Sequence, residues 1–397
     1  NYVPIINDGD NGILFELKTD APIDNFNHIT GNIDWRIDPN NIDELEKTFN
    51  FIIKVYKKNK PELFDVDTFK IIYSENNYAP VETPKAAGGT ELIQKWLFSR
   101  IDPELKNYFQ WVASRKRKLE DKPRLFWAHD LAQDPEVAFL KEHKNMLEFE
   151  KVIFVSNWQQ YQYGVYLGVP YDHGVVIQHA IEPIPDHEKP KDKISCAYMS
   201  TPHRGLEILL GAWKHLKENN KSEEVQSAEL NIFSSFKIYD RAHMDEQYRH
   251  VYKAAQEMDG VNYHGTVSND QIREELTKNH IMAYPSVYME TACISAIEAM
   301  SAKCMVVCPN LGALPETCAN FAWMYGYEPG PEKHIAVHSH ILGRAIESYR
   351  KDETEVLLSL QKTYFDTFYN WDMRMNQWNQ FLESIKMRIE LEKNDTT

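Results

Sequence analysis

Two glutamates, Glu290 and Glu298, stand with seven residues between them, directly after an apolar stretch of the chain. The apolar pattern predicts a buried strand at residues 281–284 and a helix at residues 291–301. The two carboxylates are therefore expected at a helix N-terminus and two turns further along the same helix. Backbone N–H groups at such an end point outward and favour bound hydroxyls and phosphates.

An isolated pair of glutamates on a helix is usually just a solvated face, so the surrounding sequence has to decide between the two interpretations. Pro285 and Ser286 predict a turn after the strand, and the helix continues with an apolar Glu-Ala-Met turn. A second strand is predicted at residues 304–308, followed by Gly312 and Glu316. This strand–turn–helix context favours a ligand site.

Further candidates flank predicted elements earlier in the chain. Gly88, Gly89 and Thr90 immediately precede a predicted amphipathic helix, where a glycine pair lets the backbone approach a ligand and leaves helix amides free for a diphosphate. His129, with Asp130 beside it as a weaker candidate, follows the strand predicted at residues 124–128. Alone, both patterns are weak, because a glycine pair is usually a turn and a lone histidine is usually structural.

Together these motifs resemble those of the retaining glycosyltransferases of family four, and the resemblance extends from about residue 69 to the C-terminal helix. It implies an α/β fold of the GT-B type: two Rossmann-like, doubly wound domains that face a cleft, with a C-terminal helix that crosses back to the first domain. It also implies that Glu290 holds hydroxyls of the donor sugar and that Glu298 holds the donor ribose.

The resemblance implies roles for the other candidates as well. Gly88 and Gly89 would face the donor across the cleft, and His129 would lie against the donor sugar. Arg204 and Lys237, which follow the first two strands of the second domain, are the nearest matches to the cations that bind the diphosphate. The remaining residues expected to bind the nucleotide sugar are Thr90, Thr291, Ala292 and Cys293.

Two positions depart from the family pattern. Lys303 stands where glycine is usual after the Glu-Ala-Met turn, and His179-Ala180 stands where Asn-Gly is common at the hinge between the domains. These departures bear on donor preference and hinge geometry.

The implied activity is transfer of a hexosyl or deoxyhexosyl group from a UDP- or GDP-linked donor to a hydroxyl of a glycan or glycolipid, with retention of configuration. Cations and helix N-termini can stabilise the departing diphosphate, so neither a metal ion nor a cofactor is expected. Two alternatives stay open: another GT-B enzyme, such as a sugar-nucleotide epimerase or a phosphorylase, or a catalytically silent nucleotide-binding module. The sequence offers no lysine context for the pyridoxal group of a phosphorylase.

The order of predicted elements divides the chain into four parts. Residues 63–183 are expected to form the acceptor domain, with strands at residues 69–73, 108–112, 124–128 and 152–155. Residues 184–370 are expected to form the nucleotide-sugar domain, with strands near residues 194–199, 229–233, 261–263, 281–284, 305–308 and 321–324. Residues 371–397 are expected to be a helix that crosses back to the acceptor domain through Trp378, Leu382, Ile385 and Ile389.

Residues 1–62 are either a remnant of a preceding transferase domain of the same polypeptide or a linker with a helix that docks on the acceptor domain. Two acidic patterns in the first part of the chain are rejected as metal sites. Asp65 and Asp67 precede their strand rather than follow it, and the loop at residues 8–12 has a glycine where calcium needs a ligand.

The composition of the chain limits the classes of partner that it can bind. With 397 residues, 43% of them hydrophobic, the chain can bury two cores, and it holds no apolar run of about 18 residues. A net charge of −15 disfavours nucleic acid as a partner. The basic run at residues 115–118 is more often a solvated loop than a patch for an anionic acceptor or a peripheral membrane contact. Five cysteines without a signal peptide predict reduced thiols and a cytoplasmic protein.

Overall fold

The computed structural model describes residues 88–115, 118–239 and 241–395, together with the backbone of six strands that precede residue 75. The chain divides into two compact units, Asn1–Pro84 and Lys85–Thr397, each of which is described by itself. Among the described residues, no helix is both long enough and apolar enough to span a membrane.

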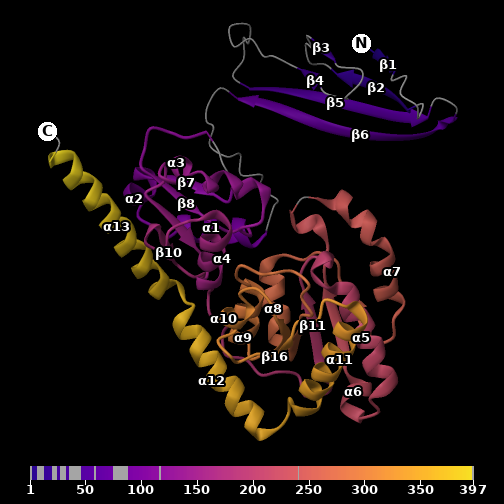
Figure 1. Cartoon of the computed structure of the whole chain (residues 1–397). Helices are drawn as coiled ribbons and strands as arrows, with labels where there is room; N and C mark the ends of the chain where they lie inside the picture. Colours follow the sequence, from indigo (N-terminus) through magenta and orange to yellow (C-terminus); the bar gives the residue numbers. More distant parts are fainter. Residues whose placement is uncertain are drawn as a thin grey trace. The chain divides into compact units, whose positions relative to one another are not determined.

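The described part of the first unit consists of antiparallel strands (Figure 1). Strands β1 (Tyr2–Ile6), β2 (Ile13–Thr19), β5 (Glu46–Lys57) and β6 (Lys60–Ser74) form one sheet in the order β1-β2-β5-β6. Strands β3 (Asn25–Phe26) and β4 (Ile33–Asp34) pair separately.

This sheet corrects two expectations. Residues 69–73 do form a strand, but they lie in β6 and pair antiparallel with β5, so they are not the first strand of a Rossmann-like sheet. The helix considered for residues 1–62 is also wrong for residues 46–57, which form β5. Apolar residues recur there at every second position, at Phe49, Phe51, Ile53 and Val55, which is the period of a strand. The loop at residues 8–12 lies outside the described residues.

The second unit begins with a four-stranded parallel sheet. We call this sheet and the helices around it the N-terminal lobe. Its strands β7 (Gln110–Ala113), β8 (Arg124–Trp127), β9 (Lys151–Phe154) and β10 (Gly174–Val176) lie in the order β10-β9-β8-β7. Three of the predicted strands are confirmed as β7, β8 and β9, whereas β10 was not predicted. The helices are α1 (Gly89–Phe98), α2 (Pro103–Tyr108), η2 (Pro135–Lys141), α3 (His143–Met146), α4 (Asn157–Leu167) and η3 (Tyr171–His173).

The C-terminal lobe contains a six-stranded parallel sheet in the order β13-β12-β11-β14-β15-β16, and all six predicted strands are confirmed. The strands are β11 (Ser195–Met199), β12 (Glu229–Phe233), β13 (Val261–Tyr263), β14 (Ile281–Ala283), β15 (Met305–Asn310) and β16 (Trp323–Gly326). The sheet is doubly wound, and the strand order changes direction beside β11 and β14, where ligands gather in such sheets. All five cysteines are free and buried, as expected.

Helices of the C-terminal lobe cover its sheet (Figure 1). They are η4 (Pro202–Arg204), α5 (Leu206–Asn219), α6 (Glu223–Ser227), η5 (Phe236–Tyr239), η6 (Ala242–Tyr248), α7 (Arg249–Glu257), α8 (Asn269–Lys278), α9 (Ile294–Ser301), α10 (Leu314–Thr317), α11 (Pro331–Ser348) and α12 (Asp352–Phe368). Lys303, where glycine was expected, adopts a left-handed φ of 55° after α9, so the departure does not change the fold.

The last helix, α13 (Trp371–Asp395), returns to the N-terminal lobe as predicted (Figure 1). Its buried residues Trp378, Leu382, Ile385 and Ile389 share one apolar cluster with Leu125 and Ile153 of the sheet. The chain crosses between the lobes twice, and the two crossings lie side by side, because the Ile181 amide donates to the Tyr369 carbonyl at 2.7 Å.

Candidate functional site

A cavity of about 800 Å³ opens at the carboxyl ends of strands from both parallel sheets. Its lining includes His129 after β8, Thr201 after β11 and Ser234 after β12. Ligands bind at this end of parallel sheets because loops and helix N-termini meet there. Of the residues predicted for the site, the cavity gathers Gly88, Gly89, Thr90, His129, Arg204, Glu290, Thr291, Ala292, Cys293 and Glu298.

The Glu290 side chain is buried, with only 4% of the residue exposed, and it is held in place by hydrogen bonds. Arg204 donates from Nη1 to Glu290 Oε1 at 2.7 Å, and the Tyr284 hydroxyl donates to the same oxygen. A buried carboxylate needs such partners, because an unpaired charge is costly away from water. Glu290 therefore keeps an acceptor oxygen on the cavity wall, with a guanidinium beside it.

Gly312 fixes the backbone of Glu290. The Ala313 amide donates to the Glu290 carbonyl at 2.7 Å, which brings the two loops together. A Cβ atom at Gly312 would lie 2.6 Å from the Glu290 carbonyl oxygen and 2.7 Å from its nitrogen, and Gly312 has a φ of 62°. Only glycine fits this approach and this conformation without displacement.

The helix after Glu290 begins at Ile294 rather than at Thr291, which corrects the predicted boundary. Thr291 is used elsewhere: its hydroxyl donates to the His129 carbonyl at 2.8 Å, and its own carbonyl accepts from the Ser156 hydroxyl at 2.6 Å. Thr291, Ala292 and Cys293 thus line the cavity as a loop that joins the two lobes.

Two helix N-termini converge on the cavity. Helix α1 begins at Gly89 with Gly88 as its N-cap, and no side chain caps its first amides. A Cβ atom at Gly89 would lie 3.3 Å from Ile294 Cδ1, so the start of α1 abuts the start of α9. Both ends carry partial positive charge, which suits a phosphate group.

Glu298 lies on α9 and is only 2% exposed. Arg273 of α8 donates from Nη1 to Glu298 Oε1 at 2.8 Å, and Asn269 Nδ2 lies 3.5 Å from Oε2. Burial raises the pKa of the Glu298 carboxyl, while Arg273 and Asn269 oppose the rise. Sequence reasoning missed Arg273, because nothing local shows that α8 and α9 face each other here.

His129 is a neutral imidazole at the mouth of β8. Burial lowers the pKa of His129 to about 3. Its ring stacks on His179 at a centroid distance of 5.9 Å, and its Nε2 atom has no hydrogen-bond partner within the described residues. His129 is therefore suited to hydrogen-bond a sugar hydroxyl rather than to act as a cation. His179, noted only as a hinge departure, also lines the cavity.

The structure does not bring Lys237 to the cavity. It lies in η5, after β12 as predicted, but its side chain is exposed and does not line the site. The cationic side chains that line the described part of the cavity are Arg115, Arg204 and Arg241. Arg241 is thus a second cation that sequence reasoning missed, since it follows β12 by eight residues rather than four. Residues 116 and 117 of the basic run lie outside the described residues.

No group of three or more His, Cys, Asp or Glu side chains that could hold a metal ion occurs among the residues described by the structure. Asp65 and Asp67 lie within β6, as part of the antiparallel sheet.

Comparison with known proteins agrees with this architecture. Residues 181–338 match the family model of glycosyl transferases group 1. The chain has no significant match among curated proteins. A glycosyltransferase from Rickettsia africae ESF-5 is similar in structure, with a TM-score of 0.56 and 14% identity over 78% of this chain and 84% of that one.

Two other solved structures are similar. Anabaena Alr3699/HepE in complex with UDP-glucose has a TM-score of 0.51 and 15% identity, over 66% of this chain and 72% of that one. The pneumococcal O-GlcNAc transferase GtfA in complex with UDP and GlcNAc has a TM-score of 0.54 and 9% identity, over 96% of this chain and 81% of that one. The chain therefore has the GT-B fold that these glycosyltransferases share, and the part that matches the group 1 family model spans residues 181–338.

Proposed function

We propose that this protein is a retaining glycosyltransferase that moves a sugar from a nucleoside-diphosphate donor to a hydroxyl of a glycan or glycolipid, without a metal ion. The observation that carries the proposal is that Glu290 and Glu298 line one cavity, each paired with an arginine. Because the HepE structure contains UDP-glucose and the GtfA structure contains UDP, we propose a UDP-linked donor. Five free, buried thiols fit a reducing compartment such as the cytoplasm.

In this proposal the residues of the cavity have different roles. Glu290 accepts hydrogen bonds from hydroxyls of the donor sugar, and Glu298 accepts them from the ribose. Arg204 and the N-termini of α1 and α9 stabilise the negative charge that develops on the departing diphosphate. His129 offers a neutral hydrogen-bonding group to the sugar.

The reaction breaks the bond between the anomeric carbon and the diphosphate oxygen and forms a bond from that carbon to the acceptor oxygen. The proton of the acceptor hydroxyl passes to the departing diphosphate on the same face of the sugar, which retains the configuration. The protein supplies position and electrostatic stabilisation rather than a covalent intermediate.

The test begins with thermal melting in the presence of UDP, GDP, ADP and their common sugar conjugates. A ligand at about 100 times its dissociation constant adds about 2.7 kcal/mol of stability, which is readily seen as a shift. Release of the nucleotide from the best donor is then measured for the wild type, for Glu290→Gln and for Glu246→Gln, an exposed control in η6.

We expect nucleotide release to fall by at least 10²-fold in Glu290→Gln and to stay unchanged in Glu246→Gln. Wild-type protein that is folded but shifts with no nucleotide would refute the proposal and favour a silent module. Equal turnover by wild type and Glu290→Gln would refute the assignment of the site.

A further inference from the structure

Arg273 connects the donor side of the cavity to the linker between the lobes. Its guanidinium donates from Nη1 to Glu298 Oε1 at 2.8 Å and from Nη2 to the carbonyl oxygen of Glu182 at 2.8 Å. Glu182 follows Ile181, where the chain crosses from one lobe to the other. One side chain therefore binds both the carboxylate assigned to the ribose and the backbone of the crossing.

The connection continues into the N-terminal lobe. The Glu182 carboxylate pairs with Arg100, which stands just after α1 and lies over the ring of Trp371 at 4.8 Å from its centroid. Helix α1 is the one whose N-terminus carries the glycine pair at the cavity. A chain of polar contacts thus runs from Glu298 through Arg273, Glu182 and Arg100 to the helix that faces the donor from the opposite lobe.

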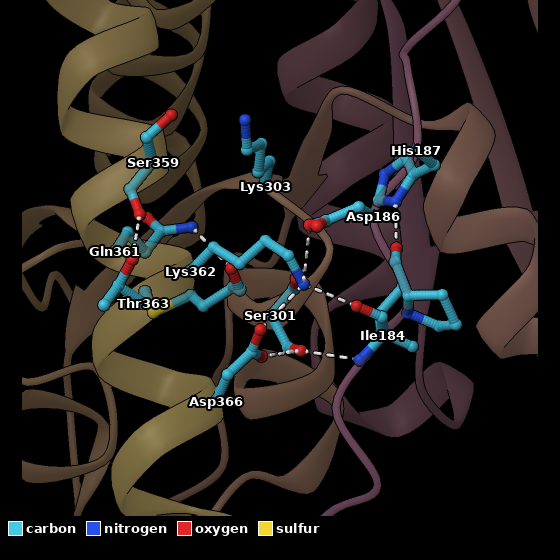
Figure 2. Close-up of polar contacts among 12 residues, drawn as sticks. Ile184, Asp186, His187, Ser301, Lys303, Ser359, Gln361, Lys362, Thr363 and Asp366 are labelled. Carbon is cyan, nitrogen blue, oxygen red and sulfur yellow. Dashed lines mark hydrogen bonds and ion pairs between the residues drawn. The ribbon is translucent and has the colours of Figure 1, made fainter.

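The next residues of the linker are fixed to the donor helix α9. Figure 2 shows the Lys362 ammonium pointing between the Ile184 carbonyl, Ser301 and Asp366. Lys362 Nζ lies 3.1 Å from the Ser301 carbonyl and 2.7 Å from Asp366 Oδ2, while the Ile184 amide donates to Ser301 Oγ at 2.8 Å. Because Ser301 ends α9, the linker at Ile184 is hydrogen-bonded to the helix that carries Glu298.

Arg273 is also the nearest described countercharge of Glu298. The charged groups that act on this carboxylate are Arg273 and Asp270, both of α8, and Asn269 adds a hydrogen bond. Burial and Asp270 raise the pKa of Glu298, and Arg273 lowers it. Without Arg273, a carboxylate that is 98% buried would more readily take up a proton and lose its ability to accept from a hydroxyl.

We propose that Arg273 is a positioning residue that orients the Glu298 carboxylate for the donor ribose and ties it to the linker at Glu182. The inference rests on the proposed function, because it assumes that a nucleotide occupies the cavity beside Glu298. A ligand hydroxyl at Glu298 then shares this carboxylate with the same guanidinium that holds the crossing between the lobes.

The test measures binding of the nucleoside diphosphate that gives the largest melting shift among UDP, GDP and ADP, from pH 5 to pH 8. Wild type is compared with Arg273→Gln, Arg273→Lys and Lys278→Gln, an exposed control on the same helix. Loss of a hydrogen bond to a charged group predicts about tenfold weaker binding or more in Arg273→Gln. The loss should grow as the pH falls, because Glu298 is then more easily protonated.

The lysine variant retains the positive charge, so it should restore the wild-type pH profile, and Glu298→Gln should abolish the extra pH dependence of Arg273→Gln. If wild type binds a nucleotide and Arg273→Gln binds it equally well at every pH, the inference is wrong while the proposed function stands. If wild type binds none of the three and none of their sugar conjugates, the proposed function itself fails. Should Arg273→Gln not fold, the inference is contradicted by an Arg273→Lys protein with an altered pH profile.

Discussion

Replacing Gly312 with alanine tests how strictly the site depends on the backbone of Glu290. Alanine at a φ of 62° costs about 1–2 kcal/mol wherever it occurs. At Gly312 the new Cβ atom would also lie 2.6 Å from the Glu290 carbonyl oxygen, so that oxygen must retreat by about 0.8 Å to reach an ordinary contact of 3.4 Å. A displacement of about 1 Å in a reacting site costs about 10²-fold in rate.

Gly168 provides the matched control. It ends α4 with a φ of 72°, and nothing lies within 4 Å of the Cβ atom that alanine would add. Gly168→Ala should therefore lose stability only through the strained backbone conformation, and it should keep the donor affinity and turnover of the wild type. Each kcal/mol lowers the melting temperature by about 2–4 °C in a domain of 150–250 residues.

The assay combines thermal melting with nucleotide release from the best donor. We expect Gly312→Ala to lose about 10²-fold in kcat/KM and at least as much thermal stability as Gly168→Ala. The reasoning is refuted if Gly312→Ala retains wild-type kcat/KM, because Glu290 would then tolerate the displacement that the geometry requires.

Three further variants probe the charges of the site. Arg204→Ala removes the ion pair of buried Glu290 and should lower the free energy of unfolding, measured in urea, by about 3 kcal/mol. The double variant Arg204→Ala/Glu290→Gln should recover part of this loss. Equal losses in the single and double variants would contradict the reasoning. His129 stays neutral in the folded protein, because folding lowers its pKa from 6.5 to about 3. The free energy of unfolding should therefore decrease as the pH drops from 6.5 towards 3, and it should decrease less steeply in His129→Asn. Parallel pH curves for the wild type and the variant would contradict this prediction. Glu316→Ala removes contacts at 2.9 Å and 3.0 Å to the first amides of α4, and should cost about 1–2 kcal/mol by the same unfolding assay, whereas an unchanged midpoint would count against the contact.

The sequence predicted the C-terminal lobe well because its signals are local. Strands β11, β14 and β15 are short, mostly apolar runs in a chain that alternates with helices, and Ser268 with Gln271 forms the capping box expected from their spacing. The stretch at residues 69–73 shows the limit of this reasoning. An apolar run predicts a strand but not its partner, and only β5 shows that the pairing is antiparallel.

The site was predictable where motif and loop coincide and not where distant segments meet. Glu290, Glu298 and the glycine pair, which were predicted from their spacing and context, all line the cavity. Arg273 reaches Glu298 across 25 residues of chain, and no local pattern marks it. The helix boundary at residue 291 was wrong because a contact made by Thr291 with another lobe replaces the first turn.

The two buried carboxylate–arginine pairs explain why this cavity has to sit between well-packed sheets. Buried ion pairs contribute little net stability, because desolvation offsets their attraction. Apolar packing must therefore supply the stability, and the largely buried strands β11, β14 and β15 do so beneath the site. In return, each carboxylate is already oriented before a ligand arrives, and less ordering remains to be done on binding. It follows that replacing a pair by apolar residues should leave a stable, well-folded protein that has lost its ligand site.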